Sequence, residues 1–305
     1  MRALITGATG FIGSRVCDAL RARGDEVVGL TRDPERARRA DPGVMWHAWN
    51  PVLERPPAGA LEGVDGVVNL IGDSIDQRWT ADAKRRIRES RERATKNLVD
   101  ALSALRERPP VLVSQSAVGY YGDRGDTIVD ESTGPGSTFD AQVCVAWEEA
   151  ARAAEELGIR VVITRSGLVL DPGGGLLREL LTPFKLGLGG PIAGGRQYMP
   201  WIHMHDEVRF LLRALDTREV SGTYNSTSPN PVTNREFSRT LGRVLGRPAV
   251  MPIPKLALKV RFGDELGEVA AGGQRVVPRR ALDEGYGFTH PDLEPALRDL
   301  LARAG

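Results

Sequence analysis

The stretch Thr6-Gly-Ala-Thr-Gly-Phe-Ile-Gly13 decides the fold class. It follows a short apolar run at residues 2–6 and precedes a segment whose apolar residues recur at helical spacing. A second apolar run at 25–31 predicts another strand, so the glycines lie in a strand–turn–helix–strand unit. The N-terminus of such a helix offers unpaired N–H groups to a phosphate. The stretch therefore predicts a nucleotide-binding α/β unit.

The three glycines, spaced G-x-x-G-x-x-G, have separate expected roles. Gly7 permits a tight turn, Gly10 lets the backbone approach a pyrophosphate, and Gly13 lets the helix pack closely against the strand. An ordinary glycine-rich turn is the competing interpretation, but the flanking strand and helix favour a nucleotide. The expected phosphate loop consists of Gly7, Thr9, Gly10, Phe11, Ile12 and Gly13.

The end of the second strand, Thr31-Arg32-Asp33-Pro34, indicates which dinucleotide binds. An acidic residue there bonds the ribose 2′-OH of NAD, whereas an arginine accommodates the 2′-phosphate of NADP. Asp33 precedes Pro34 and has the pattern of a helix N-cap, which gives it a different role. Arg32 has no such local role, and its alternative is a solvated surface charge. We therefore expect NADP, with Thr31 and Arg32 in the cofactor site.

Composition and charge exclude several classes of protein. The chain has 305 residues, 41% of them hydrophobic and 27% charged, as in globular proteins of one or two domains. Its net charge of +1 shows no basic excess that would indicate nucleic-acid binding, and two cysteines are too few for a disulfide scaffold. No apolar run reaches the ~18–20 residues of a membrane span, and residues 1–6 lack a signal-peptide pattern. We expect a cytoplasmic monomer or homodimer that binds a small-molecule substrate, without nucleic-acid or membrane partners.

Apolar runs alternate with helical patterns along the first half of the chain. Strands are expected near 44–51, 65–72, 111–116 and 159–164, and helices at 79–107 and 139–157. This alternation predicts an α/β fold with a Rossmann-type, doubly wound parallel sheet, whose ligands bind at the carboxyl ends of the strands. The strand ends expected to converge on one crevice carry Gly7, Arg32, Gly72, Ser116 and Ser166.

The chain changes character after residue 170, where glycine becomes frequent. Residues 1–170 are predicted to form the NADP-binding domain, to which 202–226 return. Residues 171–201 and 227–305 are predicted to form a smaller α/β substrate lobe, with 248–297 as its C-terminal domain. The glycine-rich segment 187–195 is either a lid or a plain connection. The following residues, with Trp201 as an apolar face, are expected to form a pocket wall opposite Ser116.

Several motifs resemble the extended, epimerase-like form of the short-chain dehydrogenase/reductase superfamily. Besides the glycine stretch, they are Val67-Val-Asn-Leu-Ile-Gly72, Ser90-Arg91, Ser116-Ala-Val-Gly-Tyr-Tyr-Gly122, Arg165-Ser-Gly-Leu-Val-Leu170, Pro200-Trp-Ile-His203 and Gly273-Gln-Arg-Val-Val-Pro278. More narrowly, the chain is similar to the NAD(P)-dependent epimerase-family proteins that carry a C-terminal domain of unknown function. The resemblance implies an NADP-binding Rossmann half and a smaller substrate half.

The resemblance also implies roles for single residues. Arg32 matches the residue that contacts the 2′-phosphate, and Arg91 matches a helix arginine that reaches toward the cofactor. The positions beside the adenosine are Asn69, Leu70 and Gly72, and those beside the nicotinamide are Ser166, Gly167 and Leu168.

The sequence departs from the superfamily at its catalytic pair. Working members use Tyr-x-x-x-Lys on the helix after the fifth strand, where the tyrosine exchanges a proton with the substrate oxygen and the lysine lowers its pKa. The matching helix, Phe139-Asp-Ala-Gln-Val-Cys-Val-Ala-Trp-Glu148, has Asp140 at the tyrosine position and Cys144 at the lysine position. No Tyr-x-x-x-Lys occurs anywhere in the chain.

Three other residues are candidates for proton chemistry. Ser116 matches the serine that polarises a substrate carbonyl, and Tyr121 follows on the same loop. His203 has an imidazole suited to acid–base catalysis. Each has a structural alternative, namely a strand-end hydroxyl, a phenol with an ordinary pKa near ~10, or a buried histidine. The group His203-Met-His205-Asp206 is too compact for a tetrahedral site, so no metal is expected.

Two functions are compatible with these patterns. The first is an NADP-dependent oxidoreductase or epimerase with an atypical active site and a small polar substrate. The alternative is a non-catalytic NADP(H)-binding regulatory or scaffold protein, which the missing tyrosine and lysine favour. Fold class does not decide between them.

Overall fold

The computed structural model describes residues 1–302 and contains a seven-stranded sheet in the order β11-β7-β5-β4-β1-β2-β3. All neighbouring strands in it are parallel. The strands are β1 (Arg2–Thr6), β2 (Glu26–Thr31), β3 (Met45–Ala48), β4 (Gly66–Asn69), β5 (Val111–Ala117), β7 (Arg160–Ser166) and β11 (Gly222–Ser226). The predicted Rossmann-type, doubly wound sheet is therefore confirmed.

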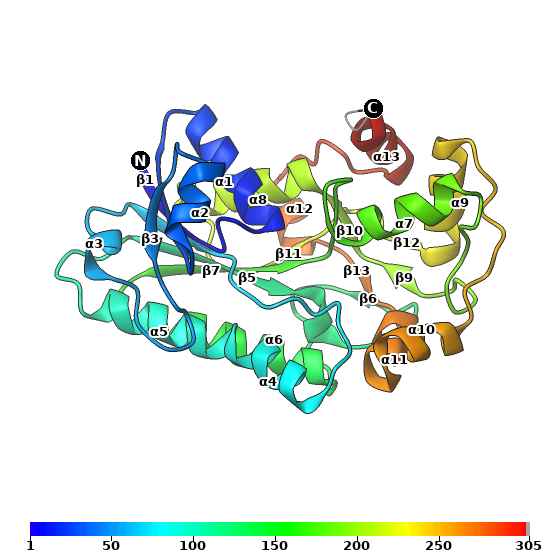
Figure 1. The fold of residues 1–305 in the computed structure, drawn as a ribbon, viewed down its shortest axis with the longest axis horizontal. Coiled ribbons are helices and arrows are strands. Elements are labelled where there is room, and N and C mark those ends of the chain that lie inside the picture. Colours follow the sequence, from blue (N-terminus) through cyan, green and yellow to red (C-terminus); the bar gives the residue numbers. More distant parts are fainter. Residues whose placement is uncertain (303–305) are drawn as a thin grey trace.

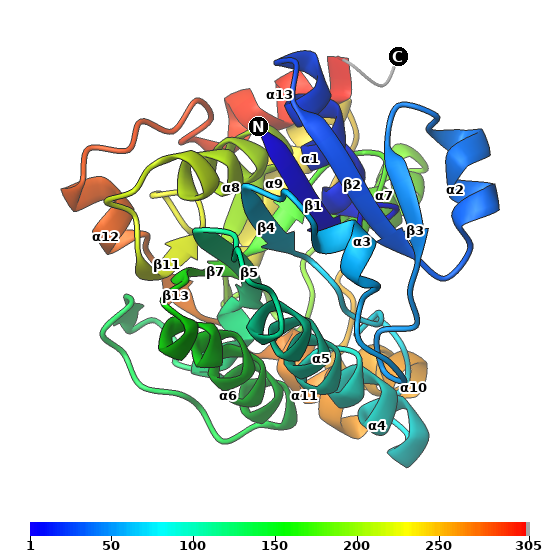
Figure 2. The same ribbon diagram turned by 90° about the vertical axis from the view of Figure 1, so that its left-hand side faces the viewer.

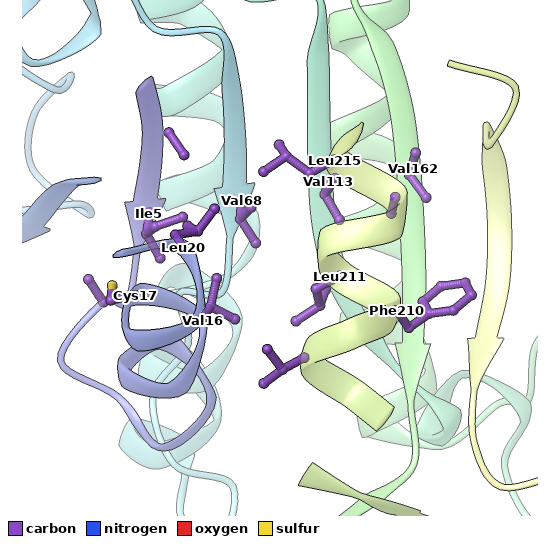
Figure 3. Close-up of a cluster of buried hydrophobic side chains, with 14 of the residues drawn as sticks. Ile5, Val16, Cys17, Leu20, Val68, Val113, Val162, Phe210, Leu211 and Leu215 are labelled. Carbon is purple, nitrogen blue, oxygen red and sulfur yellow. The ribbon is translucent and has the colours of Figure 1, made fainter. Parts of the chain in front are cut away.

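Helices cover both faces of this sheet (Figure 2). α1 (Phe11–Ala22) and α8 (Met204–Asp216) lie on one face, and α5 (Glu92–Ser103) and α6 (Phe139–Arg152) on the other. On the first face, Val16 and Leu20 of α1 and Leu211 of α8 belong to one buried cluster with Ile5 and Val113 of the strands (Figure 3). Burying one such aliphatic side chain contributes roughly 1.5–3 kcal/mol, so this layer fixes the strands whose ends form the site.

Local signals set several helix boundaries. Asp33 accepts a hydrogen bond from the Arg36 amide at 3.0 Å and caps α2 (Pro34–Ala40), as the sequence predicted. The expected helical region 79–107 is instead two helices, α4 (Ala81–Glu89) and α5. They separate at Ser90, whose hydroxyl donates to the Ile87 carbonyl and accepts from the Asp73 amide. The Ser90 side chain therefore connects the C-terminal end of α4 to the loop after β4.

A smaller lobe covers the carboxyl ends of the strands (Figure 1). Its main core contains Phe184, Trp201 and Phe237. Around it lie β8 (Leu168–Leu170), α7 (Gly175–Lys185), β9 (Tyr198–Met199), β10 (Trp201–His203), β12 (Val232–Thr233), α9 (Asn234–Leu245) and α13 (Leu293–Ala302). The remaining elements are α3 (Ala58–Leu61), η1 (Val118–Tyr121), β6 (Ile128–Val129), η2 (Ala153–Leu157), α10 (Lys255–Phe262), α11 (Asp264–Ala271), β13 (Arg275–Val276) and α12 (Arg279–Asp283). None of the described helices is long and apolar enough to cross a membrane.

The glycine-rich segment 187–195 is hydrogen-bonded to the chain that precedes α10. The Ala193 amide donates to the Ile253 carbonyl at 2.9 Å, and Ile192 and Ile253 form an isolated parallel β-bridge. Trp201 is fully buried in the lobe core, so the expectation that it forms a pocket wall is wrong. The mobility of 187–195 stays a prediction, as does the proposed division of the chain into domains.

Candidate functional site

The phosphate loop connects β1 to α1 and depends on its glycines. Gly7 has φ +66°, and a Cβ there would lie 2.7 Å from the Leu70 carbonyl oxygen. A Cβ on Gly13 would lie 2.2 Å from the Gly7 carbonyl oxygen, so α1 approaches the turn more closely than any side chain allows. The Gly10 amide closes the turn by donating to Gly7 at 2.8 Å.

The N-terminus of α1 is open to an anion. Gly10 is its N-cap, no side chain caps it, and its first turn carries no acidic residue. Thr9 and Gly10 are exposed, whereas Phe11 and Ile12 are half-buried. Free N–H groups and the positive end of the helix dipole favour a bound phosphate there. The loop therefore fits the pyrophosphate of a dinucleotide.

The end of β2 presents one uncommitted cation. Arg32 is exposed and has no hydrogen bond or ion pair within the described part of the chain. Its neighbour Asp33 is occupied by the cap of α2, and Thr31 is half-buried. A planar guanidinium at this position fits a phosphate through paired N–H donors.

The end of β4 combines buried and accessible residues. The Asn69 side chain is fully buried, donates to Thr95 and Ser114, and accepts from the Thr6 hydroxyl at 2.7 Å. It therefore joins β1, β4, β5 and α5. Its amide is fully used inside the protein, while the half-buried Leu70 and the exposed Gly72 offer backbone to a ligand.

Arg91 packs against the loop that follows β4. Its guanidinium donates to the Asp73 carbonyl at 2.9 Å and to the Ile87 carbonyl at 3.2 Å, and it lies over the Trp147 ring. Burial lowers the pKa of Arg91. A Cβ on Gly72 would lie 2.8 Å from the guanidinium carbon, so the glycine lets the arginine pack against the loop.

The loop after β7 is held by a carboxyl group that the sequence analysis missed. Glu207 of α8 is completely buried and accepts from the Ser166 and Ser226 hydroxyls, both at 2.6 Å. Burial raises the pKa of Glu207 to about 7. Its one sequence signal is an acidic residue inside the apolar pattern of α8. Next to Ser166, a Cβ on Gly167 would lie 2.3 Å from the Pro200 carbonyl oxygen, and Leu168 is half-buried.

Ser116 and Tyr121 belong to a buried polar network at the end of β5. The Ser116 hydroxyl donates to Glu148 of α6 at 2.8 Å. Glu148 forms two hydrogen bonds with Arg165 of β7, at 2.8 and 2.9 Å. Arg165 also donates to the Tyr121 hydroxyl, which in turn donates to Asn225 at 2.7 Å. Through these two hydrogen bonds the Tyr121 phenol links β7 to β11. Burial raises the pKa of Tyr121 to about 12.

Residues at the superfamily's tyrosine and lysine positions differ in accessibility. Cys144 is buried, and burial raises the pKa of its thiol to about 12, so it stays protonated. Asp140 is half-buried at the start of α6, and burial raises the pKa of its carboxyl group. A Cβ on Gly119, just after β5, would lie 2.8 Å from Asp140 Oδ2. Asp140 thus lies beside the carboxyl end of β5.

A cavity of about 270 Å³ begins at Asp140. Its walls come from the start of α6, the loop after η1 and the α11 segment of the C-terminal part. The lining residues are Trp79, Gly122, Asp123, Thr138, Phe139, Asp140, Glu265, Glu268, Val269, Gly272 and Gln274. Asp140 lines this cavity beside Thr138, and a hydrogen bond from the Thr138 hydroxyl lowers the pKa of the Asp140 carboxyl group against the larger effect of burial. The cavity is the place where the site can receive a small molecule.

His203 lies away from this cavity, between β10 and α8. Its Nδ1 accepts the His205 amide at 3.0 Å as the N-cap of α8, its ring stacks on His290, and its Nε2 lies 3.2 Å from Asp299. Burial lowers the pKa of His203 to about 4. Because Nδ1 uses its lone pair in the cap, the neutral ring carries its proton on Nε2 and faces Asp299 as a donor.

The position of the proton on the His203 ring affects whether this side chain can bind a metal. The described residues include one group of potential ligands, His203, His290 and Asp299, whose atoms lie within 4.8 Å of one another. A metal at Nε2 of His203 would displace the proton that the N-cap places there. The expectation that no metal binds stays a prediction.

The strand ends bring most predicted cofactor residues to one edge of the sheet. This edge, with a glycine turn that admits a pyrophosphate, defines an NAD(P)-binding protein of the short-chain dehydrogenase/reductase type. The family model described as "NAD dependent epimerase/dehydratase family" matches residues 3–226, and a domain of unknown function, DUF1731, matches 253–300. The chain belongs to this epimerase family, in the branch that carries the DUF1731 domain.

Relatives align over nearly the whole chain. Epimerase family protein Mb2239 of Mycobacterium bovis is 40% identical over 302 residues, which cover 99% of this chain and 98% of that protein. The crystal structure of human epimerase family protein SDR39U1 (isoform 2) with NADPH has a TM-score of 0.89 and 35% identity, with 99% of each chain covered. A nucleoside-diphosphate sugar epimerase from Corynebacterium glutamicum has a TM-score of 0.79 and 30% identity, over 98% of this chain and 58% of that one.

Proposed function

We propose that this chain is an NADP(H)-dependent oxidoreductase or epimerase that acts on a small polar substrate. The cavity at the start of α6 carries the proposal, because Asp140 lines it beside the carboxyl end of β5. The exposed Arg32 and the NADPH in the human relative's structure support NADP(H) as the cofactor. When bound, the nicotinamide supplies or accepts a hydride.

Residues of this chain bind the cofactor and exchange the proton with the substrate. The N-terminus of α1 holds the pyrophosphate and Arg32 pairs with the 2′-phosphate. Asp140 exchanges a proton with a substrate hydroxyl through its carboxyl group, because a carboxyl group whose pKa is raised by burial can serve as either acid or base. Ser116 acts through Glu148, to which its hydroxyl donates, and so positions the end of β5.

A second candidate function is a non-catalytic NADP(H)-binding regulator or scaffold. Ser116 favours it, since this residue is only 1% exposed and donates its hydroxyl to Glu148 instead of offering it to a carbonyl. Tyr121 and His203 favour it as well, because both are buried and their polar atoms are used within the protein.

NADPH oxidation on a panel of small hydroxyaldehydes and hydroxyketones separates the two functions. We expect oxidation that Asp140→Asn lowers by ~10²-fold or more, as loss of an acid–base group does. The matched control Asp126→Asn changes an exposed aspartate outside the cavity and should retain the rate. Tight NADPH binding without oxidation of any panel member supports the regulator.

We also infer a cytoplasmic protein, monomeric or homodimeric, whose partner is a small molecule and neither nucleic acid nor a membrane. The balanced charge of +1 and the two buried free thiols, Cys17 and Cys144, support this. Size-exclusion chromatography with light scattering tests the oligomeric state.

A further inference from the structure

We propose that the cavity at α6 binds an unphosphorylated, polyhydroxylated ring of monosaccharide size and excludes nucleoside diphosphate sugars. The inference rests on the proposed function, since it names the substrate class of the same site. It separates this chain from its Corynebacterium relative, which is described as a nucleoside-diphosphate sugar epimerase.

The size of the cavity limits the ligand. Its volume of about 270 Å³ lies just below the roughly 300–1,000 Å³ of pockets that hold drug-sized molecules. A liquid water occupies about 30 Å³, so the space corresponds to roughly nine waters. A six-membered ring with its hydroxyl groups fills this space, whereas a nucleoside diphosphate sugar would extend beyond it.

The charge of the lining opposes a phosphate. Asp123, Asp140, Glu265 and Glu268 contribute carboxylates, and no lysine, arginine or histidine is among the described lining residues. The nearby lysines are already paired, Lys84 with Glu265 and both Lys255 and Lys259 with Glu268. A phosphate in the cavity would find no free cation among the described lining residues, because each of these lysines is already paired with a lining carboxylate.

The polar atoms of the lining call for hydrogen-bond donors. Asp140 lines the cavity with a carboxyl group that accepts hydrogen bonds, one of them from the Thr138 hydroxyl. Asp123 is different, because its Oδ1 accepts the Gly125 and Gly273 amides. Hydroxyl groups at the edge of a ring can donate to the Asp140 carboxyl group at the start of α6.

Two aromatic side chains supply the apolar part of the cavity. Trp79 and Phe139 both line it, with ring centroids 5.1 Å apart and planes at 68°. The Trp79 indole N–H is used by the Ile75 carbonyl at 3.0 Å, which holds the ring in place. Together these rings offer apolar surface to the C–H face of a sugar-like ring while its hydroxyls point toward Asp140.

The test uses full-length protein saturated with NADPH, so that the nucleotide site is filled before any sugar is added. The probes are D-glucose, D-galactose, D-mannose and myo-inositol, each with its monophosphate, and UDP-glucose, measured by calorimetry. We expect at least one neutral ring to bind with a millimolar Kd. Its phosphate, and UDP-glucose, should bind at least ten-fold more weakly.

Variants tie the result to the cavity. Asp140→Asn should weaken binding of the neutral ring and at least halve the preference over its phosphate, whereas the control Asp126→Asn should change neither. Thermal unfolding and NADPH affinity show whether both variants are folded. Equal or tighter binding of a phosphorylated probe, or no neutral ring bound at 50-fold the expected ~1 mM Kd, overturns the substrate class while NADPH binding persists. Failure of NADPH itself to bind would instead overturn the proposed function.

Discussion

Arg32 and Asp33 are neighbours at the end of β2 with opposite charges, and only one of them is available to a cofactor. Asp33 is committed to the cap of α2, whereas Arg32 is exposed and unpaired in the described structure. We expect NADPH to bind at least ten-fold more tightly than NADH. Arg32→Ala should remove most of that difference, because a charge-assisted bond to phosphate contributes ~1.5–3 kcal/mol. Calorimetry with both cofactors measures it, and equal affinities in the unmodified protein would contradict the assignment.

Glu207 makes the stability of the protein depend on pH. Burial raises its pKa from 4.5 to about 7 in the folded state. Between these values the folded state holds the proton and the unfolded state does not, so the free energy of unfolding falls as the pH rises. Glu207→Gln should abolish this contribution. Relative to wild type, the variant should gain up to about 3 kcal/mol of stability between pH 4 and pH 8.

Urea unfolding across that pH range measures the effect of Glu207→Gln. The control Glu219→Gln alters an exposed carboxylate and should follow wild type at every pH. Parallel pH curves for wild type and Glu207→Gln would show that Glu207 titrates normally.

Residue roles could be predicted from sequence where they depend on neighbours in the chain. The glycine turn and the Asp33 cap each involve only a few adjacent residues, and the structure has the predicted backbone at both. Tyr121 is an acid–base candidate in the sequence because it follows Ser116 on the same loop. Its partner Asn225 lies 104 positions away, so no local pattern indicates their hydrogen bond. Likewise, nothing in the sequence near residue 207 indicates that two serines from other strands will donate to its carboxylate.

At the scale of single elements, Glu148 attaches α6 to the sheet. It lies on the buried face of the helix, accepts from Ser116 of β5, and makes a two-bond ion pair with Arg165 of β7. Both side chains of the pair are 4% exposed. Because α6 also carries Asp140, this pair sets the position of the proposed site relative to the strand ends.

Removing one member of that pair should be costly. Glu148→Ala leaves the Arg165 guanidinium buried without its carboxylate, and breaking a buried pair in this way typically costs about 3–5 kcal/mol. Glu149→Ala, at the adjacent exposed position of α6, should change the free energy of unfolding by less than about 0.5 kcal/mol. Denaturant unfolding of both variants measures the difference. A loss below about 1 kcal/mol for Glu148→Ala would mean that water or another group replaces the carboxylate.

At the scale of the whole molecule, the site lies between the main sheet and the α10–α11 pair. The sequence predicted the first of these more fully than the second. The alternation of strands and helices was sufficient to predict the main sheet. The α10–α11 pair was not predicted, because 248–305 lacks a clear alternating pattern and its helices are short. This pair nevertheless forms one wall of the cavity, through Glu265, Glu268 and Val269.

Exposed ion pairs connect the α10–α11 pair to the rest of the molecule, and each of the two helices also buries one leucine, Leu258 and Leu266. Lys84 of α4 pairs with Glu265 of α11, and Arg261 of α10 pairs with Glu179 of α7. On α10, the large apolar side chains of Leu256 and Val260 are exposed to solvent. We therefore expect this helical pair to open when a ligand enters the cavity, while the opening of 187–195 stays a separate prediction.

Hydrogen exchange of α11 tests whether the Lys84–Glu265 pair controls that opening. Lys84→Ala should speed amide exchange over 264–271 by roughly two- to five-fold, because an exposed ion pair contributes about 0.2–1 kcal/mol. Exchange in β5 should not change, since the sheet core does not depend on this contact. The control Lys96→Ala removes a lysine whose partner, Glu92, lies on its own helix α5, and it should leave α11 as in wild type. High salt should reproduce the Lys84→Ala result in the wild-type protein, because screening weakens exposed pairs. If 264–271 instead exchanges as slowly as β5 in every case, α11 is a fixed wall, and ligands must enter without its movement.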